Sequence, residues 1–420
     1  FSKPSTNSYL AGKQVLSMKL TDELTWRGFA NQTTLKDTSV LDDQKLTFYW
    51  GVDPSSDSMT VGNLAAAMMV RQFIQAGHKA ILLVGGATGL IGDPDGKKQE
   101  RDLKSRDEIE ANKQAIVKQY QTIFEGLEFE VVDNYDWFKD IKYIDFLRDY
   151  GKHFSLTQLL DRDFVKSRTG EGGSGISYAE FSYSLIQGYD FLHLYREKGV
   201  ALQVSGADQW GNSISGVDLI RKLENAIVNV YTSPLVINKV TGEKFGKSED
   251  GAVWLDDKKT SAYQFYQFWL NVDDNGVIEY LKIYTALSHD QIERLGRESI
   301  NSPSERAAQK TLAFEVTKLV HGRQRAESVQ KVTEVLFGDN DVSQLDQDEL
   351  QLLSNEIPTS PFGDLGDALC NAKIVSSKGE FRRLADGGAI SVNGQKITSD
   401  QNISEVSLVK KGKNTFLLVR

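Results

Sequence analysis

The pattern over residues 46–84 constrains the fold of this chain more than any other feature. Residues 46–52 bring β-branched and aromatic side chains together, as a strand does, and residues 79–84 form a second apolar run that stops at a glycine pair. Between them, residues 61–76 carry apolar side chains at helical spacing. A strand, a helix and a second strand within about 40 residues make a βαβ unit, which implies a parallel sheet.

The length and texture of the chain predict several domains. At 420 residues it is too long for one ordinary hydrophobic core. We expect an α/β catalytic domain with a Rossmann-like parallel sheet over residues 18–255, which includes a further strand at 201–204. Helical spacing then dominates, so we expect a helical domain over 256–340. Residues 1–17 lack the apolar core of a signal peptide, and we expect a disordered tail there.

The net charge of the C-terminal part changes from negative to positive along the chain. Residues 341–370 hold seven acidic residues, two prolines and no lysine or arginine, so we expect a linker over 341–363. Residues 371–420 hold six lysines and three arginines against four acidic residues. A basic module on a chain of net charge -9 is typical of a nucleic-acid contact, and we expect a small α+β domain over 364–420.

Composition indicates the class of protein and its compartment. Apolar residues make up 40% of the chain and charged residues 25%, the balance of a soluble globular protein. No stretch approaches the roughly 18 uncharged apolar residues of a membrane span. The single cysteine, Cys370, cannot form an internal disulfide, which favours a reducing, cytoplasmic setting.

The first candidate ligand-binding segment, residues 49–64, joins the first predicted strand to the first predicted helix. A helix N-terminus has unpaired N–H groups and suits phosphate. Gly62 leaves room for a base or ribose, and Thr60 and Asn63 are neutral hydrogen-bond donors at that end. Taken alone, an ordinary capping turn explains this segment at least as well.

The second candidate segment is the glycine-rich loop at 85–94, which allows the backbone to approach a ligand closely. Asp93 is a candidate partner for an ammonium group. Lys97, Lys98 and Arg101 follow and are candidates for holding pyrophosphate. The segment matches neither a GxGxxG fingerprint nor a Walker loop, so generic nucleotide motifs add little.

The third candidate segment follows the strand at 201–204. Asp208 suits ribose hydroxyls, and Gln209 suits a substrate carboxylate or carbonyl. Upstream, Tyr183, Gln187 and Asp190 fall on one face of a predicted helix. Polar groups along a face of an otherwise apolar helix are costly to bury without purpose, which favours a polar-ligand site.

A fourth segment, Lys244-Phe245-Gly246-Lys247-Ser248, places two lysines around a glycine. Such a loop could neutralise a triphosphate, although a solvated surface loop looks the same. Together, in this order and spacing, the four segments resemble the bacterial-type tyrosyl-tRNA synthetases, a class I family, from about residue 20 to residue 420. Further resembling stretches are residues 24–28, 134–137, 146–153 and 266–270.

The resemblance implies a role for each matching residue. It assigns the phenol hydroxyl of tyrosine to Tyr49 and Asp190, and the ammonium group to Asp93, Tyr183 and Gln187. It assigns the ATP or adenylate site to Asp53, Gly62, Gly206, Asp208, Gln209 and Lys247. It assigns the catalytic contacts to Thr60, Asn63, Lys97, Arg101, Lys244 and Lys247, the cations among them holding pyrophosphate.

The resemblance also implies partners. They are L-tyrosine, ATP accompanied by Mg²⁺ without a protein metal site, and tRNA(Tyr), bound by a homodimer. The dimer interface would lie in an insertion at about 136–168, and residues 256–340 would form an anticodon-binding domain. Residues 364–420 resemble an S4-type RNA-binding domain, in which Lys378, Arg382 and Arg383 would meet RNA phosphates.

Two departures from the family pattern stand out. The His-Ile-Gly-His signature reads Thr60-Val61-Gly62-Asn63, so a donor is kept at each end and both imidazoles are lost, and Trp50 stands where a small residue is common. We expect a slower or differently balanced activation step. The competing hypothesis is a non-enzymatic RNA-binding protein that kept the fold. An enzyme for tryptophan fits less well, since Tyr49 with Asp190 suits a phenol.

Overall fold

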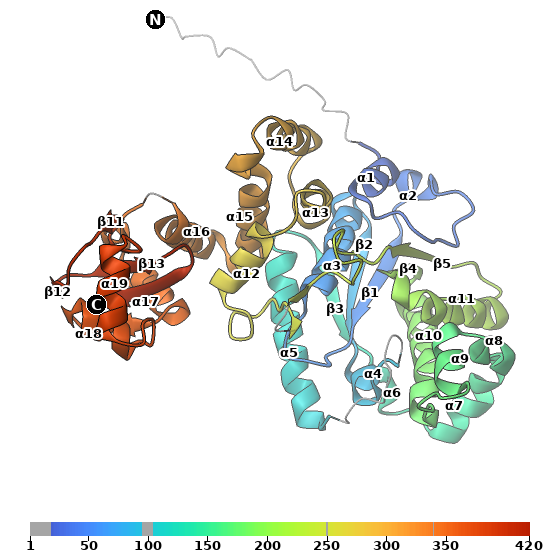
Figure 1. Cartoon of the computed structure of the whole chain (residues 1–420). Coiled ribbons are helices and arrows are strands. Elements are labelled where there is room, and N and C mark those ends of the chain that lie inside the picture. Colours follow the sequence, from blue (N-terminus) through green and yellow to red (C-terminus); the bar gives the residue numbers. More distant parts are fainter. Residues whose placement is uncertain (1–17, 95–103, 249–250, 339) are drawn as a thin grey trace, which may run out of the picture. The chain divides into compact units, whose positions relative to one another are not determined.

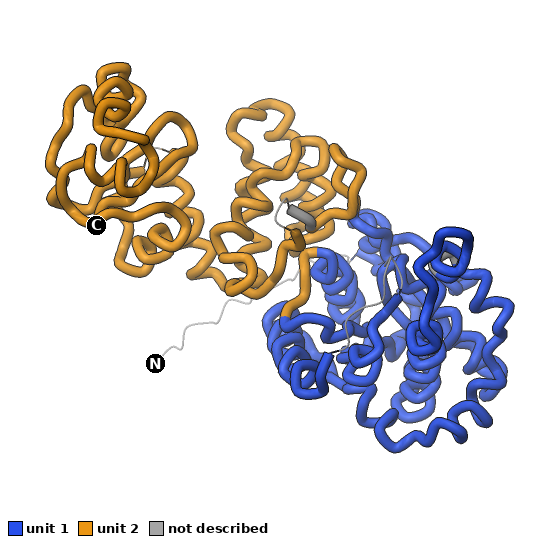
Figure 2. The backbone as a smooth tube through the Cα atoms, turned by 60° about the horizontal axis from the view of Figure 1, so that its bottom comes forward, with its two compact units in different colours: residues 1–57, 62–236 blue, residues 58–61, 237–420 orange. Residues whose placement is uncertain are grey.

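The computed structural model describes residues 18–94, 104–248, 251–338 and 340–420. The tail expected at 1–17, and the predicted site residues Lys97 and Arg101, lie outside them. The chain divides into two compact units (Figure 2). The first is made of residues up to 57 together with 62–236, and the second of 58–61 together with 237–420.

This division differs from the boundary expected at residue 255. Residues 58–61 pair with the segment around Val253, because Val61 N donates to Val253 O at 3.0 Å and Leu255 N donates to Met59 O at 2.9 Å. These main-chain hydrogen bonds attach a short piece of the N-terminal half to the second unit. Composition gives no indication of this pairing between residues 58–61 and the segment around Val253, so it could not be predicted from the sequence.

Within the described residues, the first unit is built on a sheet of five parallel strands in the order β3-β2-β1-β4-β5 (Figure 1). The strands are β1 (Thr47–Val52), β2 (Lys79–Val84), β3 (Phe129–Asp133), β4 (Val200–Gly206) and β5 (Asn229–Ser233). Thr47 lies opposite Lys79 between β1 and β2, and every neighbouring pair runs parallel. The predicted Rossmann-like α/β fold is confirmed.

Helices cover both faces of this sheet. They are α3 (Val61–Gln75), α5 (Arg106–Ile123), α10 (Tyr178–Lys198) and α11 (Trp210–Glu224). Phe48 and Trp50 of β1 contact aromatic rings of α3 and α5, whereas the intervening Tyr49 contacts Phe191 of α10. Successive side chains of a strand point to opposite faces, so α3 and α5 cover one face and α10 the other. The strand order reverses between β1 and β4, where such sheets bind ligands.

Short helices fill the connections. They are α1 (Leu20–Arg27), α2 (Val40–Asp43), α4 (Gly86–Ile91), α6 (Tyr135–Phe138), α7 (Tyr143–Asp149), α8 (Leu156–Leu160) and α9 (Asp163–Thr169). The glycine-rich segment at 85–94, expected to be a loop, therefore contains a helix. Gly85 precedes it, and a Cβ there would lie 2.1 Å from Asp53 Oδ1, so the close approach requires glycine.

Helices form most of the second unit over residues 256–340, where the sequence predicts helical spacing. They are α12 (Ala262–Leu270), α13 (Val277–Tyr284), α14 (His289–Asn301), α15 (Ala307–His321) and α16 (Arg323–Phe337). A hairpin of β6 (Lys247–Ser248) and β7 (Gly251–Ala252) precedes them. Phe245 beside this hairpin is buried and stacks on Tyr280 of α13 at 4.2 Å between ring centroids.

The C-terminal module packs two helices on an antiparallel meander. The helices are α18 (Leu365–Asn371) and α19 (Lys378–Asp386). The sheet has the order β11-β10-β13-β14-β8, formed by β8 (Thr359–Ser360), β10 (Ile390–Val392), β11 (Gln395–Lys396), β13 (Ser407–Lys411) and β14 (Thr415–Val419). A small second sheet pairs β9 (Gly363–Asp364) with β12 (Asn402–Ile403). Leu365, Phe381 and Leu417 lie in the buried core of this C-terminal module.

The expected linker at 341–363 is wrong as a structural description. Helix α17 (Gln347–Glu356) lies inside it, begins with a capping box between Asp346 and Glu349, and buries Leu350 and Leu353. β8 then runs parallel to β14 and joins the C-terminal sheet. Asp346 caps this helix, and Glu349 is buried and pairs with Lys331 of α16 at 2.6 Å, so the acidic residues belong to a folded element that composition alone did not reveal.

Candidate active site

The centre of the candidate site is the side-chain pair expected to recognise a phenol. Tyr49 in the middle of β1 and Asp190 on α10 are each only 2% exposed. The Tyr49 hydroxyl is buried and has no hydrogen-bond partner among the described residues. Burial, and then the neighbouring Asp190 carboxylate, raise the pKa of Tyr49 well above its ordinary value. A buried, unpartnered hydroxyl beside a carboxyl group suits a polar ligand atom.

Two residues without a predicted role hold Asp190 in place. Asn134 Nδ2 donates to Asp190 Oδ2 at 3.1 Å, and Trp137 Nε1 donates to Asp190 Oδ1 at 2.9 Å. Burial raises the pKa of Asp190 to about 8, while these hydrogen bonds act in the opposite direction. Both residues come from the segment that follows β3, which was noted only as a resembling stretch. Their role depends on tertiary contacts that spacing does not reveal.

A second polar cluster lies where β1 and α4 meet. Asp53 accepts hydrogen bonds from the Tyr183 hydroxyl at 2.7 Å and from Thr88 Oγ1 at 2.6 Å. Asn134 Nδ2 also donates to Thr88 Oγ1 at 3.1 Å, which links this cluster to Asp190. Tyr183 was expected near an ammonium group and Asp53 near an adenylate, and the structure brings the two into direct contact.

The predicted polar face of α10 also includes Gln187. Its Oε1 is buried and has no hydrogen-bond partner among the described residues. Tyr183, Gln187 and Asp190 occupy one helix, as expected, and Tyr183 and Asp190 are buried. The buried oxygens of Tyr49 on β1 and Gln187 on α10 therefore both lack a partner among the described residues, which suits a ligand that supplies one.

The loop after β4 joins the site through Gln209. Gln209 Nε2 donates to Asp93 Oδ2 at 2.6 Å, and Gln209 Oε1 accepts from Asn212 Nδ2 at 3.2 Å. Gly206 ends β4, and a Cβ there would lie 2.6 Å from Asp208 Oδ1. Asp93 and Gln209 are therefore brought together, whereas Asp208 lies exposed beside them.

The segment at residues 60–63 and the fourth candidate segment at 244–248 are connected through one extended stretch around Val253. Thr60 forms an antiparallel bridge with Trp254, and Val253 N donates to Gly246 O at 2.9 Å. Gly62 and Asn63 follow in the first turn of α3. Lys244 is exposed, and Lys247 opens β6, where only its backbone is described. Trp50, noted as a departure, is a core residue packed against Tyr120.

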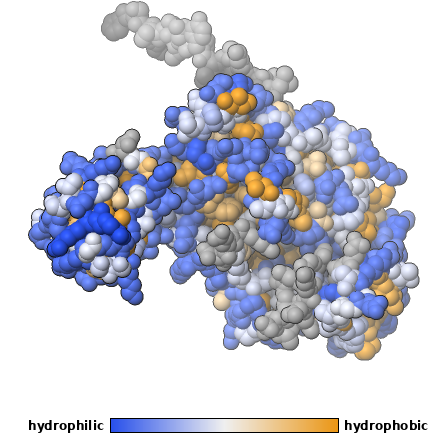
Figure 3. Space-filling model, viewed as in Figure 1, coloured by the Kyte–Doolittle hydropathy of each residue, from blue (hydrophilic) through white to orange (hydrophobic). Residues whose placement is uncertain are grey.

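The predicted RNA contacts differ from one another in their surroundings. Arg382 and Arg383 lie exposed on α19. Lys378 at the start of that helix pairs with Asp367 at 2.7 Å and Asp364 at 3.4 Å, and these contacts raise its pKa. The visible face of this module is mostly hydrophilic (Figure 3).

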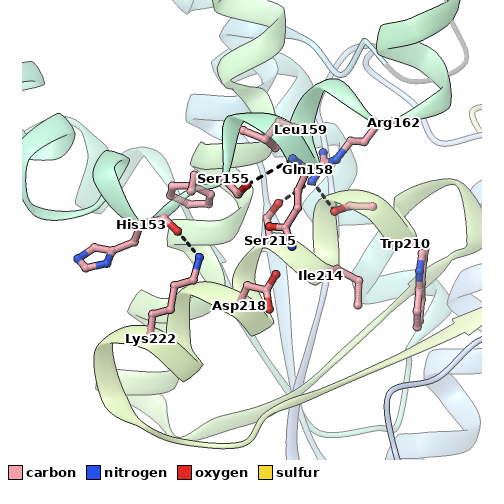
Figure 4. A pocket seen from close by; sticks show the side chains of 12 residues that line it. His153, Ser155, Gln158, Leu159, Arg162, Trp210, Ile214, Ser215, Asp218 and Lys222 are labelled. Atoms are coloured by element: carbon pink, nitrogen blue, oxygen red, sulfur yellow. Dashed lines mark hydrogen bonds between the residues drawn. The ribbon is translucent and has the colours of Figure 1, made fainter.

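A separate cavity of about 210 Å³ lies beside α11 (Figure 4). It is lined by His153, Arg162, Trp210, Asp218 and Lys222, among others. Lys222 Nζ donates to His153 O at 2.6 Å. Trp210 follows Gln209 directly in sequence, so this cavity adjoins the loop after β4.

The part of the chain that the structure describes contains neither a cluster of metal-binding side chains nor a membrane-spanning helix. Among these residues, no group of three or more His, Cys, Asp or Glu side chains is placed to hold a metal ion. None of the described helices combines the length and apolar composition needed to cross a bilayer.

Comparisons with known proteins agree with this geometry. Residues 41–338 match the family of class I tRNA synthetases for tryptophan and tyrosine. The chain is 42% identical to a tyrosine–tRNA ligase of Limosilactobacillus fermentum over 96% of this chain and 99% of that protein. It is 43% identical to the corresponding ligase of Geobacillus stearothermophilus, over 96% of this chain and all of that protein.

A solved structure shows the same fold. The C-terminally truncated mitochondrial tyrosyl-tRNA synthetase of Aspergillus nidulans superposes with a TM-score of 0.69 at 28% identity, covering 77% of this chain and 96% of that one. The Coccidioides posadasii counterpart gives 0.66 at 32% identity, covering 75% and 92%. The chain therefore belongs to the class I tRNA synthetase family of the tryptophan and tyrosine enzymes.

Proposed function

We propose that this protein is a tyrosine–tRNA ligase. It activates L-tyrosine with ATP, releases pyrophosphate and transfers the tyrosyl group to the 3′ end of tRNA(Tyr). The observation that carries the proposal is the buried Tyr49 hydroxyl, without a partner among the described residues, beside the buried Asp190 carboxyl. The near-complete coverage of relatives that are tyrosine–tRNA ligases supports it independently.

In this proposal, Tyr49 and Asp190 select the substrate by its hydroxyl. Tyrosine supplies an oxygen that can donate to Asp190 and accept from Tyr49, whereas phenylalanine offers Asp190 no donor and leaves the buried Tyr49 hydroxyl without a partner among the described residues. Sites of this kind, tyrosine-specific synthetases among them, reject the analogue without the hydroxyl by about 10⁴–10⁵-fold. Asn134 and Trp137 keep the Asp190 carboxyl oriented for this contact.

The ammonium group would bind among Asp93, Tyr183 and Gln187. Gln187 Oε1 is a buried acceptor without a partner among the described residues, and Asp93 supplies negative charge. Gln209 Nε2 donates to Asp93 Oδ2 and so holds the carboxylate in place. This arrangement directs the tyrosine carboxylate toward the loop after β4, where the adenylate would form.

ATP would bind where β1 and β4 diverge. Backbone at Gly62 and Gly206 allows close approach, and Asp53, Asp208 and Gln209 offer hydrogen-bond partners. The tyrosine carboxylate attacks the α-phosphorus in line, and the bond to pyrophosphate breaks. Thr60 and Asn63 would donate to the phosphates at the start of α3. Catalysis on this proposal comes from positioning and charge stabilisation.

Cations would neutralise the leaving pyrophosphate. We assign this role to Lys97, Arg101, Lys244 and Lys247, with Mg²⁺ travelling on ATP. Main-chain hydrogen bonds link Thr60 through Trp254 and Val253 to Gly246, which supports a common movement of residues 60–63 and 244–248. We place the reaction in the cytoplasm, which suits a chain with a single, unpaired cysteine.

We further propose that the protein acts as a homodimer. Tyr143 and Ile144 on α7 are 59% and 69% exposed, and the Tyr143 hydroxyl donates to that of Tyr178, itself 59% exposed, at 3.2 Å. Exposed apolar side chains gathered in this way mark an interaction surface. Tyr143 and Ile144 fall within the insertion at about 136–168 that is expected to form the interface.

Tyrosine-dependent exchange of labelled pyrophosphate into ATP tests the proposed function. The purified chain should catalyse exchange with L-tyrosine and should show no measurable exchange with L-phenylalanine or L-tryptophan. The Asp190→Ala variant should lose exchange at subsaturating tyrosine while its affinity for ATP stays unchanged. Exchange that responds equally to the three amino acids, or none with tyrosine, would count against the assignment.

A further inference from the structure

Arg162 connects the cavity of Figure 4 to helices α10 and α11. It is the N-cap residue of α9, and its side chain lines the cavity. Nη2 donates to Gly211 O and to Ser215 Oγ, each at 2.6 Å, and Nη1 donates to Ser184 Oγ and to Asn212 Oδ1, the latter at 2.9 Å. One guanidinium group thus joins the α8–α9 connection to both α10 and α11.

The contact with Asn212 fixes the orientation of a buried amide. Asn212 is 4% exposed, and its Oδ1 accepts from both Arg162 and the Ser184 hydroxyl, the latter at 2.7 Å. An amide whose oxygen faces a guanidinium must turn its NH₂ group the other way. That NH₂ group donates to Gln209 Oε1 at 3.2 Å.

The orientation of the Gln209 amide follows from that of Asn212. Because Gln209 Oε1 accepts from Asn212, Gln209 Nε2 points to the opposite side and donates to Asp93 Oδ2 at 2.6 Å. A chain of hydrogen bonds with one direction therefore runs from Arg162 through Asn212 and Gln209 to Asp93. Reversing either amide would place a carbonyl oxygen against an acceptor, and at the end of the chain against the Asp93 carboxylate.

Of the two donors to Asn212 Oδ1, only Arg162 defines this direction. The Ser184 hydroxyl both donates and accepts, so it can satisfy either orientation of the amide. A guanidinium group has donors and no acceptor, and its charge strengthens the hydrogen bond. The orientation of Gln209, and with it the position of Asp93, thus depends on a side chain outside the substrate site.

We propose that Arg162 is a positioning residue for the amino-acid site: through Asn212 and Gln209 it holds the Asp93 carboxylate in place for the substrate ammonium group. The inference rests on the proposed function, which assigns Asp93 to that group. The hydrogen bonds that link Arg162 to Asn212 and Gln209 lead to Asp93 and not to the phenol pair Tyr49 and Asp190. Loss of Arg162 therefore weakens recognition of the ammonium group and spares recognition of the phenol.

Equilibrium binding of two ligands to the full chain tests this inference. One is L-tyrosine, and the other is 3-(4-hydroxyphenyl)propionate, which has the same phenol and carboxylate but no ammonium group. Arg162→Ala should raise the Kd for tyrosine about tenfold, the effect of one charge-assisted hydrogen bond, and leave that for the propionate unchanged. Arg162→Lys should fall in between, since it keeps a cationic donor. Ser215→Ala, which removes an acceptor of Arg162 outside the chain of amides, is the matched control and should bind both ligands as the wild type does.

The outcomes separate the inference from the proposed function. Wild-type chain that binds neither ligand would contradict both. Wild-type binding with an equal loss of the two ligands in Arg162→Ala would overturn the positioning role alone, because a general structural defect has that effect. Thermal melting checks folding, and if Arg162→Ala does not fold, the selective loss must appear in Arg162→Lys. In an Asp93→Ala background, Arg162→Ala should cause no further loss of tyrosine binding.

Discussion

At the scale of single residues, Asp190 gives the proposed tyrosine site a pH dependence. Its pKa of about 8 leaves the carboxyl mostly protonated at pH 7, yet the phenol hydroxyl binds best to the carboxylate. Tyrosine affinity should therefore rise by up to about tenfold per unit between pH 6 and pH 8 and level off above, as the ionised fraction does. Titrating the Kd for tyrosine over this range measures it.

The Asp190→Asn variant is the control for this prediction. It keeps a side chain of the same size, whose one amide oxygen can accept from either Asn134 or Trp137 but not from both, and it removes the titrating group. Its weaker binding of tyrosine should not change between pH 6 and pH 8. A wild-type Kd that stays constant over that range would show that another group controls recognition.

Thr60 and Asn63, which stand where the family has histidines, should limit the rate of the activation step. Restoring imidazoles in a Thr60→His, Asn63→His double variant should speed tyrosyl-adenylate formation by about tenfold, because longer donors reach the phosphates better. The KM for tyrosine should stay unchanged, since these residues are assigned to the phosphates of ATP and not to the phenol. Single-turnover measurement of adenylate formation tests this. A slower double variant would mean that the surrounding residues have adapted to the shorter side chains.

At the scale of elements, helix α19 allows its basic residues to be compared. Lys378 is paired with Asp364 and Asp367, whereas Arg382 and Arg383 lie exposed on the same helix. We expect Arg382→Ala with Arg383→Ala to weaken tRNA binding and to reduce the slope of log Kd against log salt by about two. Lys378→Ala should have a smaller effect, because its charge is already neutralised. Filter binding at several salt concentrations measures both, and equal effects would contradict the difference.

The elements also show what local sequence can and cannot predict. β1, α3 and β2 were predicted nearly to the residue, because strand and helix periodicities are local and strong there. α4 was missed because its glycines resemble a loop, and α17 because its acidic residues and the nearby prolines concealed three buried leucines. The roles of Asn134 and Trp137 depend on contacts across more than 50 positions, which no local pattern encodes.

At the scale of the whole molecule, the exposed apolar residues of α7 predict the oligomeric state. Placing a charge at Ile144, which is 69% exposed, should dissociate the proposed dimer, because the carboxylate would be buried without a partner. Ile227→Asp is the matched control, as Ile227 is 88% exposed but lies between α11 and β5. Sedimentation velocity should give a dimer for the wild type and Ile227→Asp, and a monomer for Ile144→Asp. A dimer in all three would place the interface elsewhere.

The order of strands in the C-terminal sheet has a consequence for how the protein is made. β14 lies between β13 and β8, although β8 precedes it by more than 50 residues in the chain. This sheet cannot close on the ribosome until residues 415–419 have emerged, so β8 waits unpaired during synthesis of everything between them. The Rossmann-like sheet, whose last strand ends at Ser233, can be complete long before. Nascent chains stalled before residue 415 should therefore already hold the folded Rossmann-like sheet, while the C-terminal module remains open to proteases and chaperones.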